Sequence, residues 1–245
     1  MNNAQLQSPV VLRMLAHPLR WGLVRALSTS DRRVHELVQM LQQPYNLVSY
    51  HLKLLRQSKI VVLRKSDADS RDLYYSLNLD KLFVDYQNAA HAIHPGWILN
   101  ETTLPITHHT PRRVLFLCTH NSARSQIAEG LLRHMGGDNY LVCSAGNLPQ
   151  PIHPETIAVM KELGIDIRGQ YSKQITGLKD QPFDDIITVC DRVREACPTY
   201  EFCNPTIHWS IPDPTAIPDP VDRHQAFTHT AREIKRRIRQ FMSYS

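Results

Sequence analysis

The sequence lacks several features, and each absence excludes a class of protein. No run of about 18 apolar residues occurs, which argues against a membrane-spanning helix. The first residues, "MNNAQLQSPVVLRML", lack a charged segment followed by a long apolar core, so we expect no signal peptide and a cytoplasmic location. Cysteine is scarce: the chain has five, and none precedes Cys118. An odd number in a cytosolic chain does not indicate structural disulfides, so thiol chemistry or metal binding is more plausible.

Length and charge point to two domains with different partners. The chain has 245 residues, which suits two domains of roughly 100–200 residues each. Residues 1–98 carry 12 Lys and Arg against 7 Asp and Glu, whereas residues 99–245 carry 16 of each. The whole net charge of +5 therefore lies in the first part. A basic domain beside a neutral one predicts an anionic partner for the first, and nucleic acid is the usual one.

The first part has the pattern of a mainly helical winged helix-turn-helix domain. Apolar residues recur at helical spacing from Val10 to Leu27, and Asp31 is positioned to cap a short second helix, "RRVHELVQML". Pro44 in the turn "QQPYN" suits the start of a third helix, "YNLVSYHLKLLRQS". The segments "KIVVLRKS" and "RDLYYSLN" predict a β-hairpin, and "LDKLFVDYQNAAHAI" predicts a last helix.

In this arrangement the third helix enters the major groove of DNA and the hairpin contacts the phosphate backbone. We expect polar residues on one face of that helix, together with basic residues of the hairpin, to contact DNA: Tyr45, Asn46, Ser49, Tyr50, Lys53, Arg56, Arg64, Lys65 and Arg71. The alternative is a small helical domain that binds protein. We favour DNA because the turn, the polar helix face and the basic hairpin agree.

Residues 1–94 resemble the ArsR/SmtB family of winged-helix repressors. The segments that match are "LAHPLRWGLVRALS" (residues 15–28) and the recognition helix and wing, "NLVSYHLKLLRQSKIVVLRKS" to "RDLYYSLN" (residues 46–78). The resemblance implies a homodimer on a palindromic operator, paired through the first and last helices. Arsenic-sensing members often carry a cysteine pair near the recognition helix, and residues 31–58 contain none. The sensing site is therefore left open.

A linker separates the two predicted domains. Residues 95–111, "PGWILNETTLPITHHTP", contain three prolines and show no periodicity. We predict a DNA-binding domain at residues 1–98, a linker at 99–111 and a second domain at 112–245. The histidines of this region stand beside no cysteine or carboxylate at ligand spacing, so we predict no metal site: His91, His94, His108 and His109.

The second part begins with a pattern of strand, loop and helix. "RRVLFLC" has the character of a buried parallel strand, and "SQIAEGLLRHM" has helical periodicity. Cys118 begins the loop between them and Arg124 ends it. Backbone N–H groups, the helix N-terminus and the arginine fork suit an oxyanion, and the same positive field stabilises a thiolate nucleophile. Cys-x5-Arg here predicts a pocket that binds an oxyanion and attacks it with sulfur.

The predicted oxyanion cradle is the loop itself: Thr119, His120, Asn121, Ser122, Ala123, Arg124 and Ser125. We expect Ser125 to hydrogen-bond the thiolate and Asn121 to hold the shape of the loop. A departing oxygen needs a proton donor, and Asp213 in "HWSIPDPT" follows the probable strand "TIHW". Asp219 lies in a second "PDP", and the order of elements favours Asp213.

Two further cysteines suggest redox chemistry. Cys190 ends the strand-like run of "DDIITVCDRVREACP", and Cys197 follows seven residues later. In a helix they would lie about 10.5 Å apart along the axis. A disulfide needs Cα atoms within about 7 Å, so a bond between them requires this segment to unwind. The alternative is that the two cysteines are unrelated.

Residues 112–241 resemble the low-molecular-weight tyrosine phosphatase fold, a flavodoxin-like α/β domain with a parallel sheet. They are more similar to the thioredoxin-coupled arsenate reductases built on that fold. The matching segments, in family order, are "FLCTHNSARSQIAEG", "CSAGN", "VCDRVREACP" and "HWSIPDPT". One departure is Ala123, where the family often has cysteine. Neither Cys143 nor Cys203 has an assigned role.

The resemblance implies roles for five residues. Cys118 would be the nucleophile, Arg124 the oxyanion clamp and Asp213 the acid, with Cys190 and Cys197 as second and third redox cysteines. Arsenate would be reduced and released as arsenite when a Cys118–Cys190 disulfide forms. The disulfide would then move to Cys190–Cys197. Thioredoxin or a similar dithiol would reduce it, with no bound cofactor.

Two other functions compete with a bifunctional arsenic-responsive regulator and arsenate reductase. The same loop would suit a tyrosine phosphatase fused to a DNA-binding domain. However, "DPTAIPDP" lacks the aromatic residues that usually follow the acid in such phosphatases, and a phosphatase needs neither Cys190 nor Cys197. The other possibility is a non-enzymatic repressor that binds arsenite through Cys190, Cys197 and Cys203.

Overall fold

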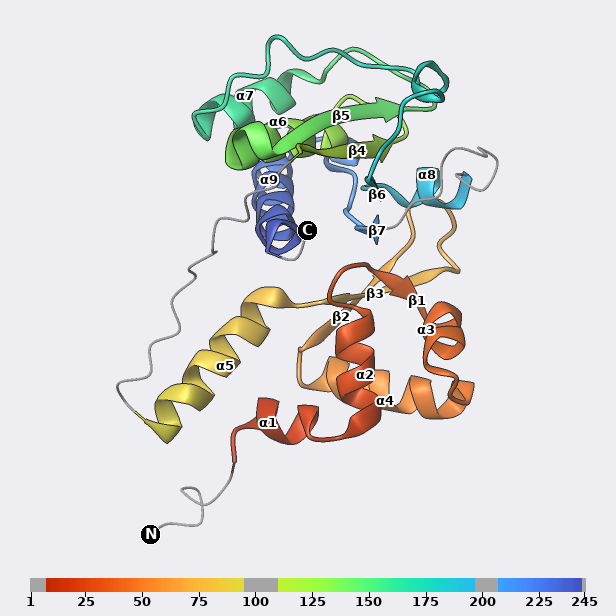
Figure 1. Cartoon of the computed structure of the whole chain (residues 1–245), viewed down its shortest axis with the longest axis vertical. Coiled ribbons are helices and arrows are strands. Elements are labelled where there is room, and N and C mark those ends of the chain that lie inside the picture. The colour runs from red at the N-terminus through yellow and green to blue at the C-terminus, as the bar shows by residue number, and fades with distance from the viewer. Residues whose placement is uncertain (1–7, 95–109, 197–206, 244–245) are drawn as a thin grey trace. The chain divides into compact units, whose positions relative to one another are not determined.

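A computed structural model describes residues 8–94, 110–196 and 207–243, with the side chain of residue 196 excepted. The chain divides into two compact units, residues 1–65 with 70–102 and residues 66–69 with 103–245, and each is described by itself. Figure 1 shows their elements. Among the described residues, none of the helices combines the length and hydropathy needed to cross a bilayer.

The first unit is a winged helix-turn-helix. Its three-stranded antiparallel sheet has the order β1-β3-β2. The elements are α1 (Val10–Leu15), α2 (Pro18–Ala26), β1 (Arg32–Arg33), α3 (Val34–Leu41), α4 (Tyr45–Gln57), β2 (Val61–Lys65), β3 (Leu73–Leu77) and α5 (Leu79–Ile93). The predicted third helix, hairpin and last helix are confirmed. The buried faces of the helices share one core that includes Leu23, Leu37, Leu52 and Leu55.

Two expectations for this unit were wrong in detail. The helix expected over Val10–Leu27 is two helices, because His17 precedes Pro18 and adopts an extended conformation that ends the first. Asp31 does not cap the next helix. Arg32 and Arg33 pair with β3 first, and the cap is then provided by Glu36, which accepts the Arg33 N–H at 2.7 Å.

The second unit is a four-stranded, wholly parallel sheet with the order β5-β4-β6-β7. Its strands and main helices are β4 (Arg112–Cys118), α6 (Arg124–Gly136), β5 (Tyr140–Gly146), α7 (Pro154–Glu162), β6 (Asp185–Thr188), α8 (Asp191–Ala196), β7 (Ile207–His208) and α9 (Pro220–Met242). Short 3-10 turns cover Gly137–Asn139, Ile175–Leu178 and Pro214–Ala216. Helices α6 and α9 pack together, and α7 packs against both (Figure 1).

The sheet places the functional loop. Strand β4 lies between β5 and β6 and is buried from Val114 to Cys118, as an inner parallel strand should be. Because the carboxyl ends of parallel strands share one edge, the loop after β4, the end of β5 and the turn after β6 meet there. The pattern of strand, loop and helix predicted for this segment is confirmed, with the helix starting at Arg124.

Gly146, the last residue of β5, touches the loop too closely for any side chain. A Cβ there would lie 2.5 Å from the Thr119 carbonyl oxygen and 2.9 Å from the Asn121 nitrogen. Both are backbone atoms, so the loop itself would have to move. We expect Gly146→Ala to lower the free energy of unfolding by about 1–3 kcal/mol, the usual cost of overpacking. Urea unfolding of the full chain measures it.

The matched control is Gly169→Ala, because nothing lies within 4 Å of a Cβ at that position. It should unfold at the wild-type urea concentration. Equal stability of the Gly146→Ala and Gly169→Ala variants would contradict the close approach of β5 to the loop.

A pH-sensitive contact joins α7 and α9. The His224 Nδ1 lies 2.8 Å from Glu155 Oε2, and its Nε2 lies 3.3 Å from Glu162 Oε1. The hydrogen bond to Glu155, with the charge of Glu162, raises the pKa of His224 above 6.5. Because the pKa is raised, the contact contributes its full free energy to the stability of the fold below pH 6.5. This contribution is lost as the pH rises through the folded-state pKa.

We therefore expect His224→Gln to unfold at lower urea than wild type at pH 5.5, and the two to converge at pH 9. The contact is exposed, so 0.5 M salt should shrink the difference in stability between the variant and wild type. The screening length falls from about 10 Å at 0.1 M salt to about 3 Å at 1 M. Urea unfolding at the two pH values measures it. A difference that grows with pH would have the wrong sign for this contact.

Candidate active site

The loop from Thr119 to Ala123 turns all its carbonyls outward. The acceptors are held by donors that come mainly from residues 148–172: Leu148 N–H on Thr119 (2.9 Å), Gln150 N–H on His120 (2.9 Å), the Ser172 hydroxyl on Asn121 (2.8 Å), His153 N–H on Ser122 (3.0 Å) and Ile127 N–H on Ala123 (2.9 Å). In a trans peptide the C=O and the next N–H point in opposite directions. The N–H groups of residues 120–124 therefore face away from those donors, toward one concavity.

Such a row of inward N–H groups at a helix N-terminus suits an anion. Cys118 lies at its start, only 3% exposed, and the Asn121 N–H points at its sulfur from 3.2 Å. Asn121 has a φ of 48°, a left-handed conformation that lets the chain fold back toward Cys118. The loop residues predicted to form the oxyanion cradle lie between Cys118, at the end of β4, and the first turn of α6.

A buried hydrogen-bond network lies beside Cys118. The Asn121 Oδ1 accepts the Lys173 N–H at 2.7 Å, which sets the orientation of the amide. Its Nδ2 therefore donates to both Ser125 Oγ (2.9 Å) and Ser144 Oγ (2.7 Å). The Ser125 Oγ also lies 2.8 Å from the Cys118 sulfur; it can accept from the neutral thiol or donate to the thiolate.

The network ends on a buried carboxylate. Ser144 donates to Glu129, which is also paired with Arg133 and, at 3.4 Å, with the Lys173 ammonium. Sequence reasoning assigned a role to none of these residues. Ser144 and Lys173 are distant from the loop in the chain, whereas Glu129 and Arg133 lie on α6, and the segments "CSAGN" and "SARSQIAEG" contained Ser144 and Glu129 without pointing to their contact.

Arg124 and Asp213 face each other across the site. The Arg124 guanidinium is 6% exposed and donates to the Ile211 carbonyl (2.9 Å) and to Asp213 Oδ2 (2.9 Å). The other oxygen of Asp213 accepts from the N–H (3.1 Å) and hydroxyl (2.8 Å) of Thr215. Asp219 instead caps α9 by accepting from Val221 and Asp222. The structure therefore brings Asp213, and not Asp219, to the loop.

The electrostatics at rest favour a neutral thiol and an ionised acid. Burial raises the pKa of the Cys118 thiol, although Arg124 and the Ser125 hydroxyl act against it. Burial also opposes ionisation of Asp213, but Arg124 and Thr215 outweigh it and lower the pKa of that carboxyl. An anion that occupies the cradle would compete with Asp213 for Arg124.

A second thiol lies at the loop. The Cys190 sulfur is 3.1 Å from the Thr119 hydroxyl and completely buried. It comes two residues after β6 ends, immediately before α8. Cys118, Cys143 and Cys190 are free thiols. Cys197 and Cys203 lie outside the described residues, as does most of the predicted linker.

The helix Asp191–Ala196 bears on the predicted disulfide. Because the residues that follow Cys190 are helical, a bond to the cysteine seven positions later requires α8 to unwind. Within the described part of the chain, no group of three or more His, Cys, Asp or Glu side chains is arranged to hold a metal ion.

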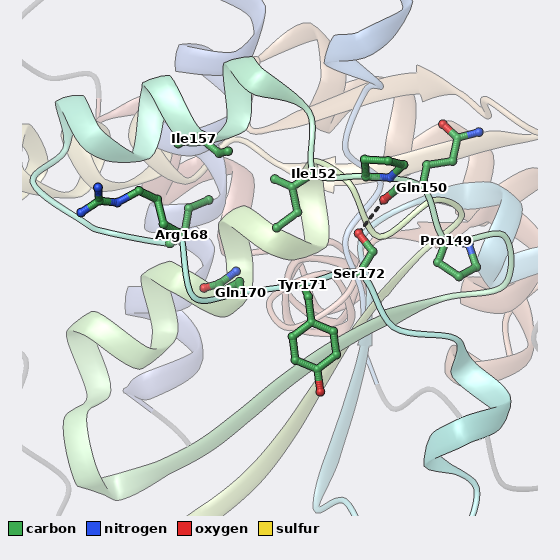
Figure 2. A pocket seen from close by; sticks show the side chains of 10 residues that line it. Pro149, Gln150, Ile152, Ile157, Arg168, Gln170, Tyr171 and Ser172 are labelled. Carbon is green, nitrogen blue, oxygen red and sulfur yellow. Dashed lines mark hydrogen bonds between the residues drawn. The ribbon is translucent and has the colours of Figure 1, made fainter.

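A hollow of about 530 Å³ lies on the outer side of the loop (Figure 2). It is lined by Pro149, Gln150, Pro151, Ile152, Ile157, Ile167, Arg168, Gln170, Tyr171 and Ser172. Figure 2 shows the bond between the Ser172 hydroxyl and the Gln150 carbonyl at its wall; the one proton of this hydroxyl is shared between that oxygen and the Asn121 carbonyl. None of the candidate catalytic residues lines it. Two residues of its wall, Gln150 and Ser172, instead donate to carbonyls of the loop.

In the first unit, α4 exposes a polar face and buries the opposite, mainly apolar face. Val48, His51, Leu52 and Leu55 are buried. Of the residues predicted to contact DNA, Ser49 and Arg64 are half-buried, and the rest are exposed: Tyr45, Asn46, Tyr50, Lys53, Arg56, Lys65 and Arg71. The structure therefore places all nine on the recognition helix or the hairpin.

Comparison with known proteins gives matches to both units. The family described as low molecular weight phosphotyrosine protein phosphatase matches residues 113–244, and the bacterial regulatory protein arsR family matches residues 17–62. An arsenate reductase of Halalkalibacterium halodurans is 36% identical over 129 residues, which cover 52% of this chain and 93% of that protein.

Two further matches have different coverage. A glutaredoxin arsenate reductase of Synechocystis is 40% identical over 79 residues, 32% of this chain and 60% of that protein. A solved arsenate reductase in its oxidized state is 29% identical, covers 54% of this chain and 96% of that chain, and superposes with a TM-score of 0.47.

The family match spans more than half of the chain, and the geometry of the loop agrees with it. The chain belongs to the low molecular weight phosphotyrosine protein phosphatase family, and ahead of that domain it carries a helix-turn-helix of the arsR family of bacterial regulators.

Proposed function

We propose that the second unit reduces arsenate to arsenite and that the first binds operator DNA. The observation that carries the first proposal is the buried Cys190 thiol at the Thr119 hydroxyl, because a phosphatase needs no second sulfur beside its loop. The relative that covers most of this domain, at 36% identity, is named as an arsenate reductase.

In the first step an oxygen of the bound arsenate accepts the Cys118 proton, and the thiolate attacks arsenic held in the loop. The N–H groups of residues 120–124 and the Arg124 guanidinium bind the oxyanion. A sulfur–arsenic bond forms and an arsenic–oxygen bond breaks. Asp213 protonates the leaving hydroxide, which departs as water, and arsenic remains in the +5 state. Asp213 takes up this proton once arsenate has drawn Arg124 away and added negative charge beside it.

In the second step the Cys190 thiolate attacks the Cys118 sulfur. A sulfur–sulfur bond forms while the sulfur–arsenic bond breaks, and its electron pair stays on arsenic. Arsenic leaves as arsenite in the +3 state, and the two sulfurs together lose two electrons. Because Cys190 lies at the loop in the reduced enzyme, this step needs a short movement.

The remaining steps restore the thiols. Cys197 attacks Cys190 as α8 unwinds, which releases the Cys118 thiolate and moves the disulfide to Cys190–Cys197. A dithiol protein such as thioredoxin then reduces that bond. The match to a glutaredoxin arsenate reductase makes glutaredoxin the other donor to assay. The cycle uses no resident metal or cofactor.

Cys190→Ser should lower steady-state arsenate reduction with thioredoxin more than about 1,000-fold, as losing one member of a catalytic unit does. Hydrolysis of an aryl phosphate should change little, since it needs only the loop, Arg124 and Asp213. Arsenite release and aryl phosphate cleavage are measured on the same preparations.

Cys143→Ser is the matched control, because Cys143 is a free, partly buried thiol on β5. It should keep both activities. Wild-type protein that cleaves the aryl phosphate but releases no arsenite with either thioredoxin or glutaredoxin would make this domain a phosphatase.

The first unit, in this proposal, binds an operator through α4 and the hairpin. Tyr45, Asn46, Ser49, Tyr50 and Lys53 reach base edges or nearby phosphates from the groove face of α4. Three further side chains contact the backbone from the hairpin: Arg64, Lys65 and Arg71. Arg56 lies on the last turn of α4. The protein acts as a homodimer that pairs through α1 and α5, the first and last helices of this unit. It works in the cytoplasm, where the operator DNA lies.

A phosphate contact has a measurable salt signature. Each lysine or arginine that neutralises a phosphate adds about 0.9 to the slope of log affinity against log salt. We expect Lys65→Ala to weaken binding to a random 30-base-pair duplex and to reduce that slope by about 1. Fluorescence anisotropy at several salt concentrations measures it.

Lys81→Ala is the matched control, because Lys81 lies on α5 and pairs with Asp85. Its slope should equal that of wild type. Equal slopes for the Lys65→Ala variant and wild type would remove the hairpin from the proposed DNA contact.

A further inference from the structure

A buried polar chain at the start of α8 takes no part in the proposed cycle. The Thr188 hydroxyl lies 2.8 Å from His208 Nδ1, and His208 Nε2 lies 3.1 Å from Asp191 Oδ1. All three residues are at most 1% exposed. A buried ionisable histidine between a hydroxyl and a carboxylate calls for an explanation, because such groups are costly to bury.

The fold places this chain beside Cys190. Thr188 ends β6 and His208 ends β7, and the two are direct partners in the parallel pairing of these strands. From Thr188 the polypeptide backbone passes through Val189 and Cys190 to Asp191, the first residue of α8. His208 therefore joins the end of the sheet to the start of the helix, with Cys190 in the two-residue span between them.

The hydrogen bond to Asp191 has one direction. A carboxylate can only accept, so His208 Nε2 carries the proton and donates it, whether or not the imidazole is charged. Asp191 is completely buried in the first turn of α8. Without the histidine the carboxylate would lose a buried donor, so the pair constrains where this turn lies.

We propose that His208 is a positioning residue for Cys190. It holds Asp191, and Asp191 fixes the start of α8, so that the Cys190 sulfur stays 3.1 Å from the Thr119 hydroxyl at the edge of the loop. The inference rests on the proposed function, because position matters only if Cys190 attacks Cys118. The histidine is bonded to neither substrate nor sulfur: Thr188 holds its Nδ1, and its Nε2 acts on Cys190 through Asp191.

This role predicts a difference between two steps. The loop, Arg124 and Asp213 are untouched by His208, so the reactivity of Cys118 should not depend on it. Attack by Cys190 should depend on it strongly. A displacement of about 1 Å costs up to about 100-fold in such a step, so we expect a 10- to 100-fold loss.

The chain offers a matched pair of amide substitutions. Glutamine places its amide nitrogen near the position of His Nε2, so His208→Gln retains a donor to Asp191. Asparagine places its nitrogen near His Nδ1, so His208→Asn reaches Thr188 but not Asp191. His134→Asn is the control for the substitution itself, because His134 is exposed in the last turn of α6.

The experiment adds arsenate, without any reductant, to the reduced full-length protein in which Cys197→Ser keeps the disulfide at Cys118–Cys190; every His208 variant is compared in this background. The Cys118–Cys190 disulfide is quantified over time by mass spectrometry after acid quench and alkylation. In parallel, the rate of Cys118 alkylation by iodoacetamide is measured across pH. We expect slow disulfide formation in His208→Asn, near wild-type formation in His208→Gln, and one alkylation profile for all variants.

Two results would overturn the inference. One is disulfide formation in His208→Asn at the wild-type rate. The other is a changed Cys118 alkylation profile in His208→Asn, since that would mean a general loss of structure at the loop.

Diamide, an azo oxidant that takes two electrons and two protons from a thiol pair, separates this inference from the proposed function. It forms the same disulfide without arsenic, and His208→Asn should slow that reaction too. Wild-type protein that forms the disulfide with diamide but not with arsenate would overturn the arsenate chemistry, while the diamide rates still decide the role of His208.

Discussion

The site depends on the outward hydrogen bonding of one loop. Five consecutive carbonyls, from Thr119 to Ala123, are held by hydrogen bonds, and this directs the N–H groups of residues 120–124 to the side opposite their donors. Most of the donors belong to residues 148–172, on segments that follow β5. The cradle is thus built by tertiary contacts, and Gly146 allows them by carrying no side chain where β5 meets the loop.

This explains what the sequence could and could not predict at the site. Cys118 and Arg124 were identifiable because strand, loop and helix are contiguous and their spacing is local. Asp213 was chosen over Asp219 by the order of elements, and the structure shows a hydrogen-bonded reason: one faces Arg124, while the other caps α9. The network below the loop, from Ser144 to Lys173, has no local pattern, because its members meet only in the folded sheet.

The first unit shows the same division between local and tertiary information. The hairpin and the last helix follow from alternation and periodicity. The opening helix does not follow from periodicity. The apolar spacing continues across Pro18, but the residue before a proline is disfavoured in the helical conformation, so the backbone breaks there into two helices. The short strand at Arg32 depends on pairing with β3, a partner some forty residues later, so a capping rule applied to Asp31 alone chose the wrong residue.

The burial of Cys118 sets a condition on the proposed chemistry. A thiol whose pKa is raised by burial is mostly protonated at rest, and so it is shielded from adventitious oxidation. Two groups favour the thiolate: the positive charge of Arg124 acts on it, and the Ser125 hydroxyl lies 2.8 Å from its sulfur. Arsenate brings basic oxygens into the cradle, and one of them can accept the thiol proton while the N–H groups hold the remaining charge. Negative charge then moves from oxygen to sulfur within one site, so the nucleophile forms only where its substrate is bound.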